Sequence, residues 1–185
     1  MGGSITIDEI KENVPNYADY KVFVETGTYK GETIREMAQY FDELYTFEIH
    51  PELYQYSLSL NTSPKINYLF GDSVTLLPKT ISVHNLNEKK CMFFLDAHIS
   101  GHDSGFNPAH QVPLLEEIDI IATGIKSECV LCLDDARFFA QEAGKPWDWS
   151  HISIDRIKSI IGAERIDKLF VNNDRVWVVL NATES

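Results

Sequence analysis

The chain has 185 residues, of which 44% are hydrophobic, and a formal net charge of −12. Its length suits a single domain over residues 1–185, and its negative charge argues against nucleic acid and anionic membranes as partners, because phosphate binding needs a basic stripe. No apolar run is long enough to span a membrane. The start "MGGSITIDEI" lacks the basic start and apolar core of a signal peptide, so we expect a cytoplasmic protein.

Short β-branched or aromatic runs alternate with helical patterns along most of the chain. The first strand is expected within residues 20–27, and a helix with one apolar face follows at 31–41. The pattern continues with strands at 43–49, 66–73, 91–98 and 129–136 and with helices at 51–60, 74–81, 112–124 and 152–162. This alternation predicts parallel strands joined by right-handed crossovers.

The end of the chain differs. Residues 168–180 read "KLFVNNDRVWVVL", two β runs joined by "NND" with no room for a helix, which is a hairpin signal. We therefore predict an α/β fold with a doubly wound, mostly parallel seven-stranded sheet and a C-terminal antiparallel hairpin. Ligands of such sheets bind outside the carboxyl ends of the strands.

The three cysteines do not form a disulfide framework. Cys129 and Cys132 make a CxxC, but it lies inside an apolar strand-like run and not at a turn or helix start. Together with Cys91 they are predicted to be buried packing thiols.

The first strand runs into "ETGTYKG", with an acid and two glycines at a strand-to-helix junction. A plain tight turn is one explanation, because Gly-x-x-x-Gly is a weak signal. A dinucleotide fingerprint needs a middle glycine that lets the backbone reach the pyrophosphate, and none lies between Gly27 and Gly31. Glu25 would repel a pyrophosphate but attract an ammonium and a sulfonium group. The loop therefore favours S-adenosylmethionine over NAD.

Two further strand ends carry polar residues. Glu48 lies 21 positions after Gly27, where an acid can accept hydrogen bonds from both ribose hydroxyls of an adenosine ligand. A carboxylate favoured by the dipole of the next helix is the alternative. Asp72 and Ser73 follow the third strand, where an adenine amino group could be bound.

"VETGTYKGET", "FEIHPE", "FGDS" and "FFLDAH", in this order and at strand ends, resemble the successive motifs of class I S-adenosylmethionine-dependent methyltransferases. The seven-strand plan is similar too, so the resemblance covers nearly the whole chain. The first loop keeps only the first and last glycine of the usual run, a version that sugar-modifying members often have. The resemblance implies that the methionine end of the cofactor is bound by Glu25, Gly27, Thr28 and Gly31. It further implies that Glu48 binds the ribose and that Asp72 and Ser73 flank the adenine.

Carboxylates also follow the fourth and fifth strands, at Asp96, Asp134 and Asp135. Three carboxylates at one sheet edge repel one another unless a cation or proton lies among them, and oxygen ligands suit Mg²⁺ or Ca²⁺ better than zinc. The pattern resembles the metal-dependent O-methyltransferases of the macrocin type, which implies a divalent-ion site at these residues. Alternatively, Asp134 or Asp135 caps a helix or pairs with Arg137, and Asp96 acts alone as a general base.

The segment 96–110, "DAHISGHDSGFNPAH", is typical of a polar, acceptor-binding lid on the ligand side of a sheet. Its histidines have the intrinsic pKa to take a proton from a hydroxyl near neutral pH. His98, and after it His102, are the candidate bases, with a solvated loop histidine as the alternative for each.

Three roles are open for Trp147 and Trp149: they could form a wall of an acceptor pocket, pack their loop onto the domain, or make a homodimer contact.

The predicted reaction is methyl transfer to a small-molecule hydroxyl with divalent-metal assistance. A sugar or phenol as the acceptor is implied by the resemblance alone. The alternatives are a protein of another activity on the same fold, such as metal-assisted hydrolysis, hydroxylation or ligand binding, and less favourably an NAD-dependent oxidoreductase.

Overall fold

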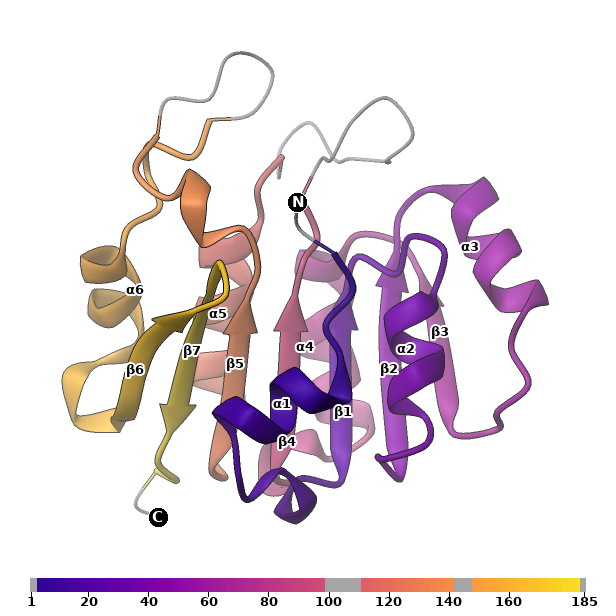
Figure 1. Ribbon diagram of the computed structural model, residues 1–185, viewed down its shortest axis with the longest axis horizontal. Coiled ribbons are helices and arrows are strands. Elements are labelled where there is room, and N and C mark those ends of the chain that lie inside the picture. The colour runs from indigo at the N-terminus through magenta and orange to yellow at the C-terminus, as the bar shows by residue number, and fades with distance from the viewer. Residues whose placement is uncertain (1–2, 99–110, 142–147, 184–185) are drawn as a thin grey trace.

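The computed structural model describes residues 3–98, 111–141 and 148–183. Within these ranges, seven strands form one sheet in the order β3-β2-β1-β4-β5-β7-β6 (Figure 1). The strands are β1 (Val22–Thr26), β2 (Glu43–Glu48), β3 (Ile66–Phe70), β4 (Cys91–Leu95), β5 (Cys129–Leu133), β6 (Ile166–Asn172) and β7 (Arg175–Leu180). The α-helices are α1 (Ile7–Asn13), α2 (Glu32–Met37), α3 (Pro51–Ser59), α4 (Ser73–Val83), α5 (Leu114–Gly124) and α6 (Ile154–Ile161).

Strands β1 to β5 run parallel, and β7 pairs antiparallel with both β5 and β6. The predicted α/β fold class, with a mostly parallel seven-stranded sheet and a C-terminal hairpin, is confirmed. The hairpin begins at Ile166, two residues before the predicted start, and carries a register shift between Ile166 and Lys168. None of the helices in the described ranges has the length and apolar composition needed to cross a bilayer.

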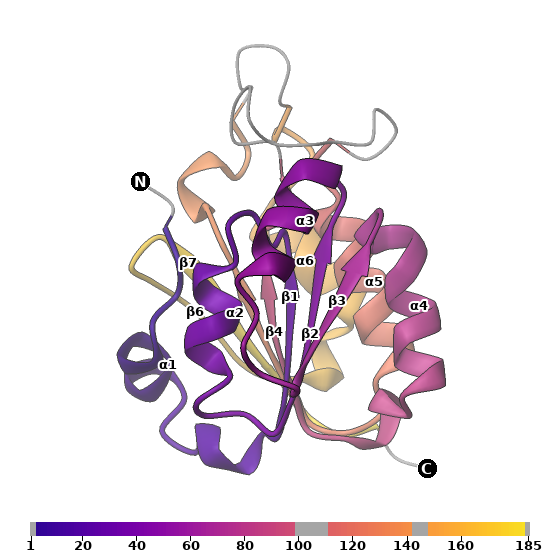
Figure 2. The ribbon, with the colours of Figure 1, turned by 90° about the vertical axis from the view of Figure 1, so that its right-hand side faces the viewer.

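Each face of the sheet has its own hydrophobic core because successive residues of a strand point to opposite faces. On β1, Val22 and Val24 belong to a cluster with α4, α5 and α6, whereas Phe23 belongs to a cluster with α1 and α2. Figure 2 shows α1 and α2 on one side of the sheet and α4 and α5 on the other. The all-buried strands β1, β4 and β5 are therefore the centre of a three-layer structure.

Helix α1 lies in a segment for which no helix was predicted. Thr6 caps it, with its hydroxyl oxygen accepting the Glu9 N–H at 3.3 Å. Ile7 and Ile10 are buried in the cluster on the α2 side of the sheet. The helix is stabilised by this tertiary packing, since seven residues are too few for a stable isolated helix.

The three cysteines are fully buried and free, which confirms the prediction of packing thiols. Cys91 and Cys129 lie opposite each other on the neighbouring parallel strands β4 and β5, without a disulfide bond. Burial raises the pKa of each of the three thiols, so none is a reactive thiolate at neutral pH.

The loop after β1 lies against the end of β4. Gly27 has a φ of 85°, and a Cβ added to it would clash with the carbonyl oxygen of Asp96. The N–H groups of Gly27 and Thr28 both donate to the Phe47 carbonyl oxygen at 3.0 Å. This glycine is therefore required by the contact between two strand ends, whatever ligand the loop binds.

We predict that Gly27→Ala lowers the free energy of unfolding by at least about 2 kcal/mol, because the left-handed conformation alone costs an alanine about 1–2 kcal/mol and the clash with Asp96 adds to it. Urea denaturation checks this. Gly3→Ala is the control, since no atom lies within 4 Å of its added Cβ. Equal stability of the two variants would contradict the prediction.

Candidate functional site

The strand order brings most of the predicted site residues to one edge of the sheet. β1 lies between β2 and β4, so the loop that follows β1 lies between Glu48 at the end of β2 and Asp96 after β4. The predicted adenosyl residues therefore flank one side of this loop, and the predicted acidic cluster flanks the other.

Glu25 lies under the loop. Its side chain is on the α2 face of the sheet and the residue is 2% exposed. Its Oε2 accepts a hydrogen bond from the Thr46 hydroxyl at 2.6 Å, and the Thr46 and Thr28 hydroxyl oxygens are 2.5 Å apart. Burial raises the pKa of Glu25 to about 8, against the hydrogen bond from Thr46 and with the help of the Glu48 charge. In this structure Glu25 is thus mostly neutral at pH 7 and supports the loop through two threonines.

Glu48 joins two loops. Its Oε2 accepts the Tyr29 N–H at 2.7 Å, and its Oε1 accepts the His50 N–H at 2.8 Å. Burial raises the pKa of Glu48 in spite of these hydrogen bonds. Since a carboxylate has about four acceptor sites, both oxygens keep capacity for a further donor such as a ribose hydroxyl.

Asp72 and Ser73 begin α4, as their predicted role requires, and each has a partner within the protein. Asp72 Oδ2 accepts from the Thr75 hydroxyl at 3.0 Å. The Ser73 hydroxyl donates to Oε1 of Glu117 on α5 at 2.5 Å. Glu117 is a functional candidate that the sequence reading missed. The available signal was an acid on the helix face that also carries Leu114, Ile118 and Ile121, a face otherwise apolar.

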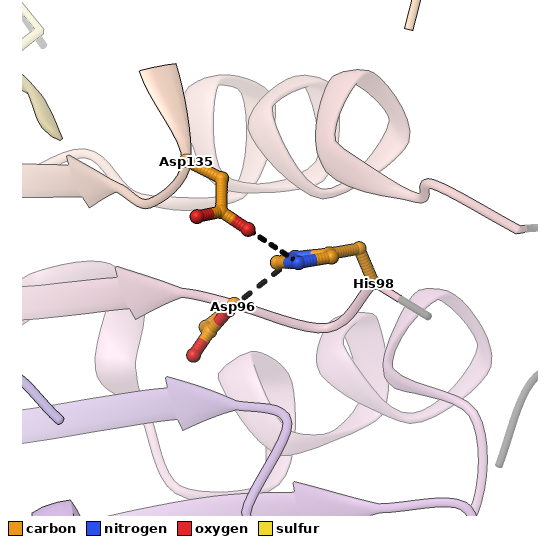
Figure 3. A group of neighbouring side chains, drawn as sticks. All are labelled: Asp96, His98 and Asp135. Carbon is orange, nitrogen blue, oxygen red and sulfur yellow. Dashed lines mark ion pairs between the residues drawn. The ribbon is translucent and has the colours of Figure 1, made fainter. Parts of the chain in front are cut away.

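Asp96, His98 and Asp135 form a second cluster on the other side of the loop (Figure 3). His98 Nδ1 lies 3.3 Å from Asp96 Oδ1, and its Nε2 lies 2.6 Å from Asp135 Oδ2. One ligand atom from each residue lies within 4.8 Å of the others, so the donor set can surround a metal ion. Asp135 also has a φ of 58°, a strained backbone of the kind found at functional sites.

The protonation states of this cluster depend on one another. Burial and the nearby carboxylates of Asp134 and Asp135 raise the pKa of Asp96 well above its ordinary range, although the His98 charge opposes this. Burial alone would lower the pKa of His98, but the hydrogen bond to Asp135 and the charges of the aspartates outweigh it and raise the pKa. The same contacts with His98 and Arg137 overcome burial and lower the pKa of Asp135. The raised pKa of His98 and the lowered pKa of Asp135 together favour an imidazolium that donates to the Asp135 carboxylate.

Asp134 lies outside this cluster. Its Oδ1 is 3.0 Å from Nε of Arg175, which also binds Glu9 of α1 at 2.6 Å. Of the three predicted metal ligands, the structure therefore brings Asp96 and Asp135 together with His98, and it pairs Asp134 with a cation. Arg137 lies 2.6 Å from Asp135 Oδ1, the pairing considered as an alternative in the sequence.

His102 and Trp147 lie outside the described residues. Trp149 is 3% exposed, and its ring meets that of His98 edge-on with centroids 5.1 Å apart. It also packs against Phe138 and Phe139. Of the three readings for Trp149, packing onto the domain is the one observed.

We predict a pH-dependent gain in stability for Glu25→Gln. Between its ordinary pKa of 4.5 and the folded-state value of about 8, the unfolded chain loses the Glu25 proton while the folded chain keeps it, so this group lowers stability as the pH rises. The amide that replaces the carboxyl group cannot ionise and can still accept from Thr46. The variant should match the parent near pH 4.5 and exceed its free energy of unfolding by up to roughly 4 kcal/mol at pH 8.

Urea titrations at pH 4.5, 6 and 8 measure this gain. Glu12→Gln, on the exposed side of α1, makes the same change in formal charge and is the control. A difference between Glu25→Gln and the parent that stays constant with pH would contradict the assignment.

No protein-family model matches the sequence, and a search of curated proteins finds no match. Solved structures share the fold. The O-methyltransferase TomG of Streptomyces achromogenes, solved with SAM, matches with a TM-score of 0.64 and 13% identity over 98% of this chain and 82% of its own. The N-methyltransferase NodS of Bradyrhizobium japonicum matches with a TM-score of 0.57 and 9% identity over 96% and 94%. A spermidine synthase of Thermotoga maritima has a TM-score of 0.56 and 13% identity over 88% and 54%. At these identities the comparisons establish that the chain has the fold of these transferases.

Proposed function

We propose that this chain is an S-adenosylmethionine-dependent methyltransferase that acts on a small-molecule hydroxyl. The observation that carries the proposal is the position of the Gly27 loop, with Glu48 on one side and the cluster of Asp96, His98 and Asp135 on the other. Methyl transfer needs a bound adenosyl group and an acceptor that loses a proton, and the two must lie side by side.

The residues beside the loop fit an adenosyl ligand. Gly27 and Gly31 have positive φ values of 85° and 72°, which place backbone with no side chain at the edge of the sheet. Glu48 offers acceptor capacity for ribose hydroxyls, and Asp72 and Ser73 begin α4 on the adenine side. When bound, S-adenosylmethionine supplies an electrophilic methyl group; the chain supplies orientation and removes the proton of the acceptor.

Asp96 is the stronger candidate base in this arrangement. Both ring nitrogens of His98 face carboxylates, and the raised pKa of His98 favours the imidazolium, which cannot accept a proton. Asp96 has a raised pKa and keeps 28% of its side chain exposed, so its carboxylate is both more basic than usual and reachable by an acceptor. We propose that Asp96 accepts the hydroxyl proton and that His98 holds the carboxylate in place.

A divalent ion fits the same cluster. Asp96 and Asp135 provide the carboxylates that Mg²⁺ and Ca²⁺ prefer, and the His98 imidazole extends the choice to Mn²⁺ and similar ions. The ion would lower the pKa of an acceptor hydroxyl and orient it. Because a histidine nitrogen binds a metal only when it is unprotonated, and the pKa of His98 is raised, binding of the ion would require release of a proton from His98.

A different transferase or a metal-assisted hydrolase remains the second candidate. The fold is shared with a spermidine synthase as well as with O- and N-methyltransferases, so the architecture alone does not fix the reaction. An acceptor with a sugar or phenolic hydroxyl is favoured by the sequence resemblance.

We predict that the chain binds S-adenosylmethionine and does not bind NAD, as measured by isothermal titration calorimetry. Glu48→Gln removes the charge that would pair with ribose hydroxyls, and it should raise the Kd for S-adenosylmethionine about tenfold or more. Glu52→Gln on the exposed side of α3 is the matched control. Binding of NAD alone would refute the proposed function.

We also predict that Mn²⁺ binds the cluster, detected by electron paramagnetic resonance of free Mn²⁺, and that Mg²⁺ competes for the site. Asp135→Asn should weaken Mn²⁺ binding at least about tenfold. Replacing even a residue that only hydrogen-bonds to a metal ligand typically lowers the metal affinity by this much, and Asp135 is itself a proposed ligand. Asp119→Asn, on the exposed side of α5, should bind like the parent. If Asp135→Asn and Asp119→Asn bind Mn²⁺ with equal affinity, the proposed metal site is refuted.

A further inference from the structure

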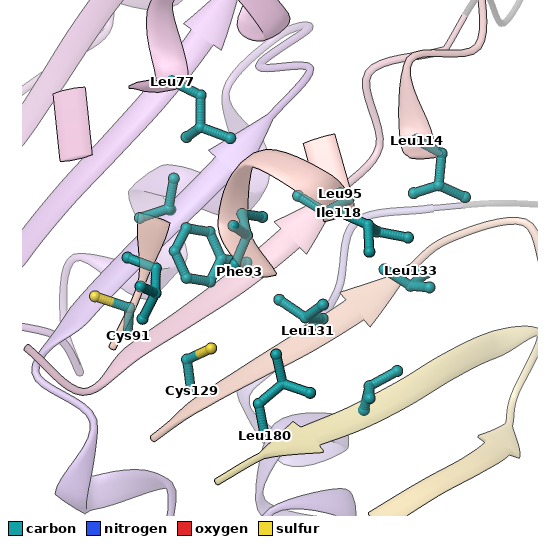
Figure 4. Packing of buried hydrophobic residues seen from close by; sticks show 14 of the residues in the cluster. Leu77, Cys91, Phe93, Leu95, Leu114, Ile118, Cys129, Leu131, Leu133 and Leu180 are labelled. Atoms are coloured by element: carbon teal, nitrogen blue, oxygen red, sulfur yellow. The ribbon is translucent and has the colours of Figure 1, made fainter. Parts of the chain in front are cut away.

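Glu117 is a buried acid without a role in the reaction described above. It is 1% exposed and is one of the buried residues of α5. Figure 4 shows Leu114 and Ile118 of the same helix among the packed apolar side chains. Burying a carboxyl group in an apolar cluster costs free energy unless its oxygens find partners. Its two oxygens have them: the Thr26 hydroxyl donates to Oε2 at 3.2 Å, and the Ser73 hydroxyl donates to Oε1 at 2.5 Å.

One of these partners is next to the proposed adenosyl site, and the other belongs to it. Thr26 ends β1 and directly precedes Gly27, and Ser73 directly follows Asp72 at the start of α4. Thr26 is fully buried and Ser73 is 5% exposed, so neither hydroxyl has water as a ready substitute. Glu117 therefore joins the methionine side and the adenine side of the site through one side chain that belongs to neither.

Glu117 also borders the acceptor side of the proposed site. A small cavity is lined by Glu117 together with His98, Pro113, Asp134 and Trp149. Leu114, the first residue of α5, lines this cavity as well. The first turn of α5 is thus in contact with both halves of the proposed site.

A purely structural role predicts something different. The neighbours of Glu117 on its helix face are Leu114, Ile118 and Ile121, and an apolar residue at position 117 would match them at no cost of desolvation. Burial raises the pKa of Glu117 to about 8, with the hydrogen bonds from Ser73 and Thr26 opposing the shift and the charges of Asp72 and Glu116 adding to it. The folded protein therefore buries a carboxyl group, at a cost in desolvation free energy, at a position where an apolar side chain would pack equally well.

We propose, on the basis of the proposed function, that Glu117 is a positioning residue: it fixes Thr26 and Ser73, and with them the Gly27 loop and the start of α4, at the spacing that an adenosyl ligand needs. The site is then preorganised in the free protein, and less of the binding free energy is lost in ordering it.

The test measures the Kd for S-adenosylmethionine by calorimetry in the parent and in a set of single and double variants. Glu117→Ala should raise the Kd about tenfold or more, because it leaves two buried hydroxyls without partners. Glu117→Gln can accept from one hydroxyl and donate to the other, so it should restore the Kd to within about threefold of the parent. Ile121→Ala, one turn along the same buried face, should lower the melting temperature and leave the Kd unchanged.

A double-mutant cycle with Ser73→Ala measures the coupling between Ser73 and Glu117 in S-adenosylmethionine binding. If Glu117 acts through Ser73, the Kd of the double variant Ser73→Ala/Glu117→Ala should be close to that of Glu117→Ala and not to the product of the two single effects. Should Glu117→Ala fail to fold, Glu117→Leu, which fills the space but cannot accept a hydrogen bond, takes its place in the same cycle.

The outcomes separate this inference from the proposed function. A parent chain that does not bind S-adenosylmethionine overturns the proposed function and the role of Glu117 together. A parent chain that binds, with Glu117→Ala binding equally well or with Glu117→Ala and Ile121→Ala raising the Kd by the same factor, overturns the role of Glu117 alone. Multiplicative effects of Ser73→Ala and Glu117→Ala do so as well.

Discussion

The contact between Gly27 and the carbonyl group of Asp96 is the constraint on which the site depends. Without a Cβ at position 27, the loop after β1 lies directly on the backbone after β4. The residues on each side of this contact are the proposed base and the proposed methionine seat. Two functional groups that must work within a few ångströms of each other are therefore positioned by backbone packing, which is more rigid than contacts between long side chains.

Around this contact three buried glutamates have hydrogen-bond partners within the protein. Glu25 binds Thr46, Glu48 binds the N–H groups of two loops, and Glu117 binds Thr26 and Ser73. Each of these glutamates is nearly or fully buried, and burial raises the pKa of each. In a low-dielectric edge of this kind, hydrogen bonds are strong and errors of geometry are costly. The loops are thus held in one arrangement before any ligand binds.

The sequence was sufficient for the fold because the alternation of strands and helices is local and the "NND" turn leaves no room for a helix between the last two β runs. It was also sufficient to place Glu48 and Asp96 at strand ends. It could not give the partners of the site residues, which come from distant segments: Asp134 pairs with Arg175, and Glu117 with Thr26. The three aspartates were expected to converge, and the separation of Asp134 from Asp135 has a local reason, since consecutive residues at a strand end point in different directions.

The charges explain why Asp96 differs from its neighbours. Asp134 has Arg175 as a partner, and Asp135 has both Arg137 and His98. Among the ion pairs of the described residues, Asp96 has only His98, at the longer distance of 3.3 Å. Its carboxylate is consequently the least compensated of the three and the one with the strongest tendency to take up a proton. Under the proposed function this imbalance is useful, because the least compensated carboxylate lies beside the Gly27 loop, where the acceptor must give up its proton as the methyl group is transferred.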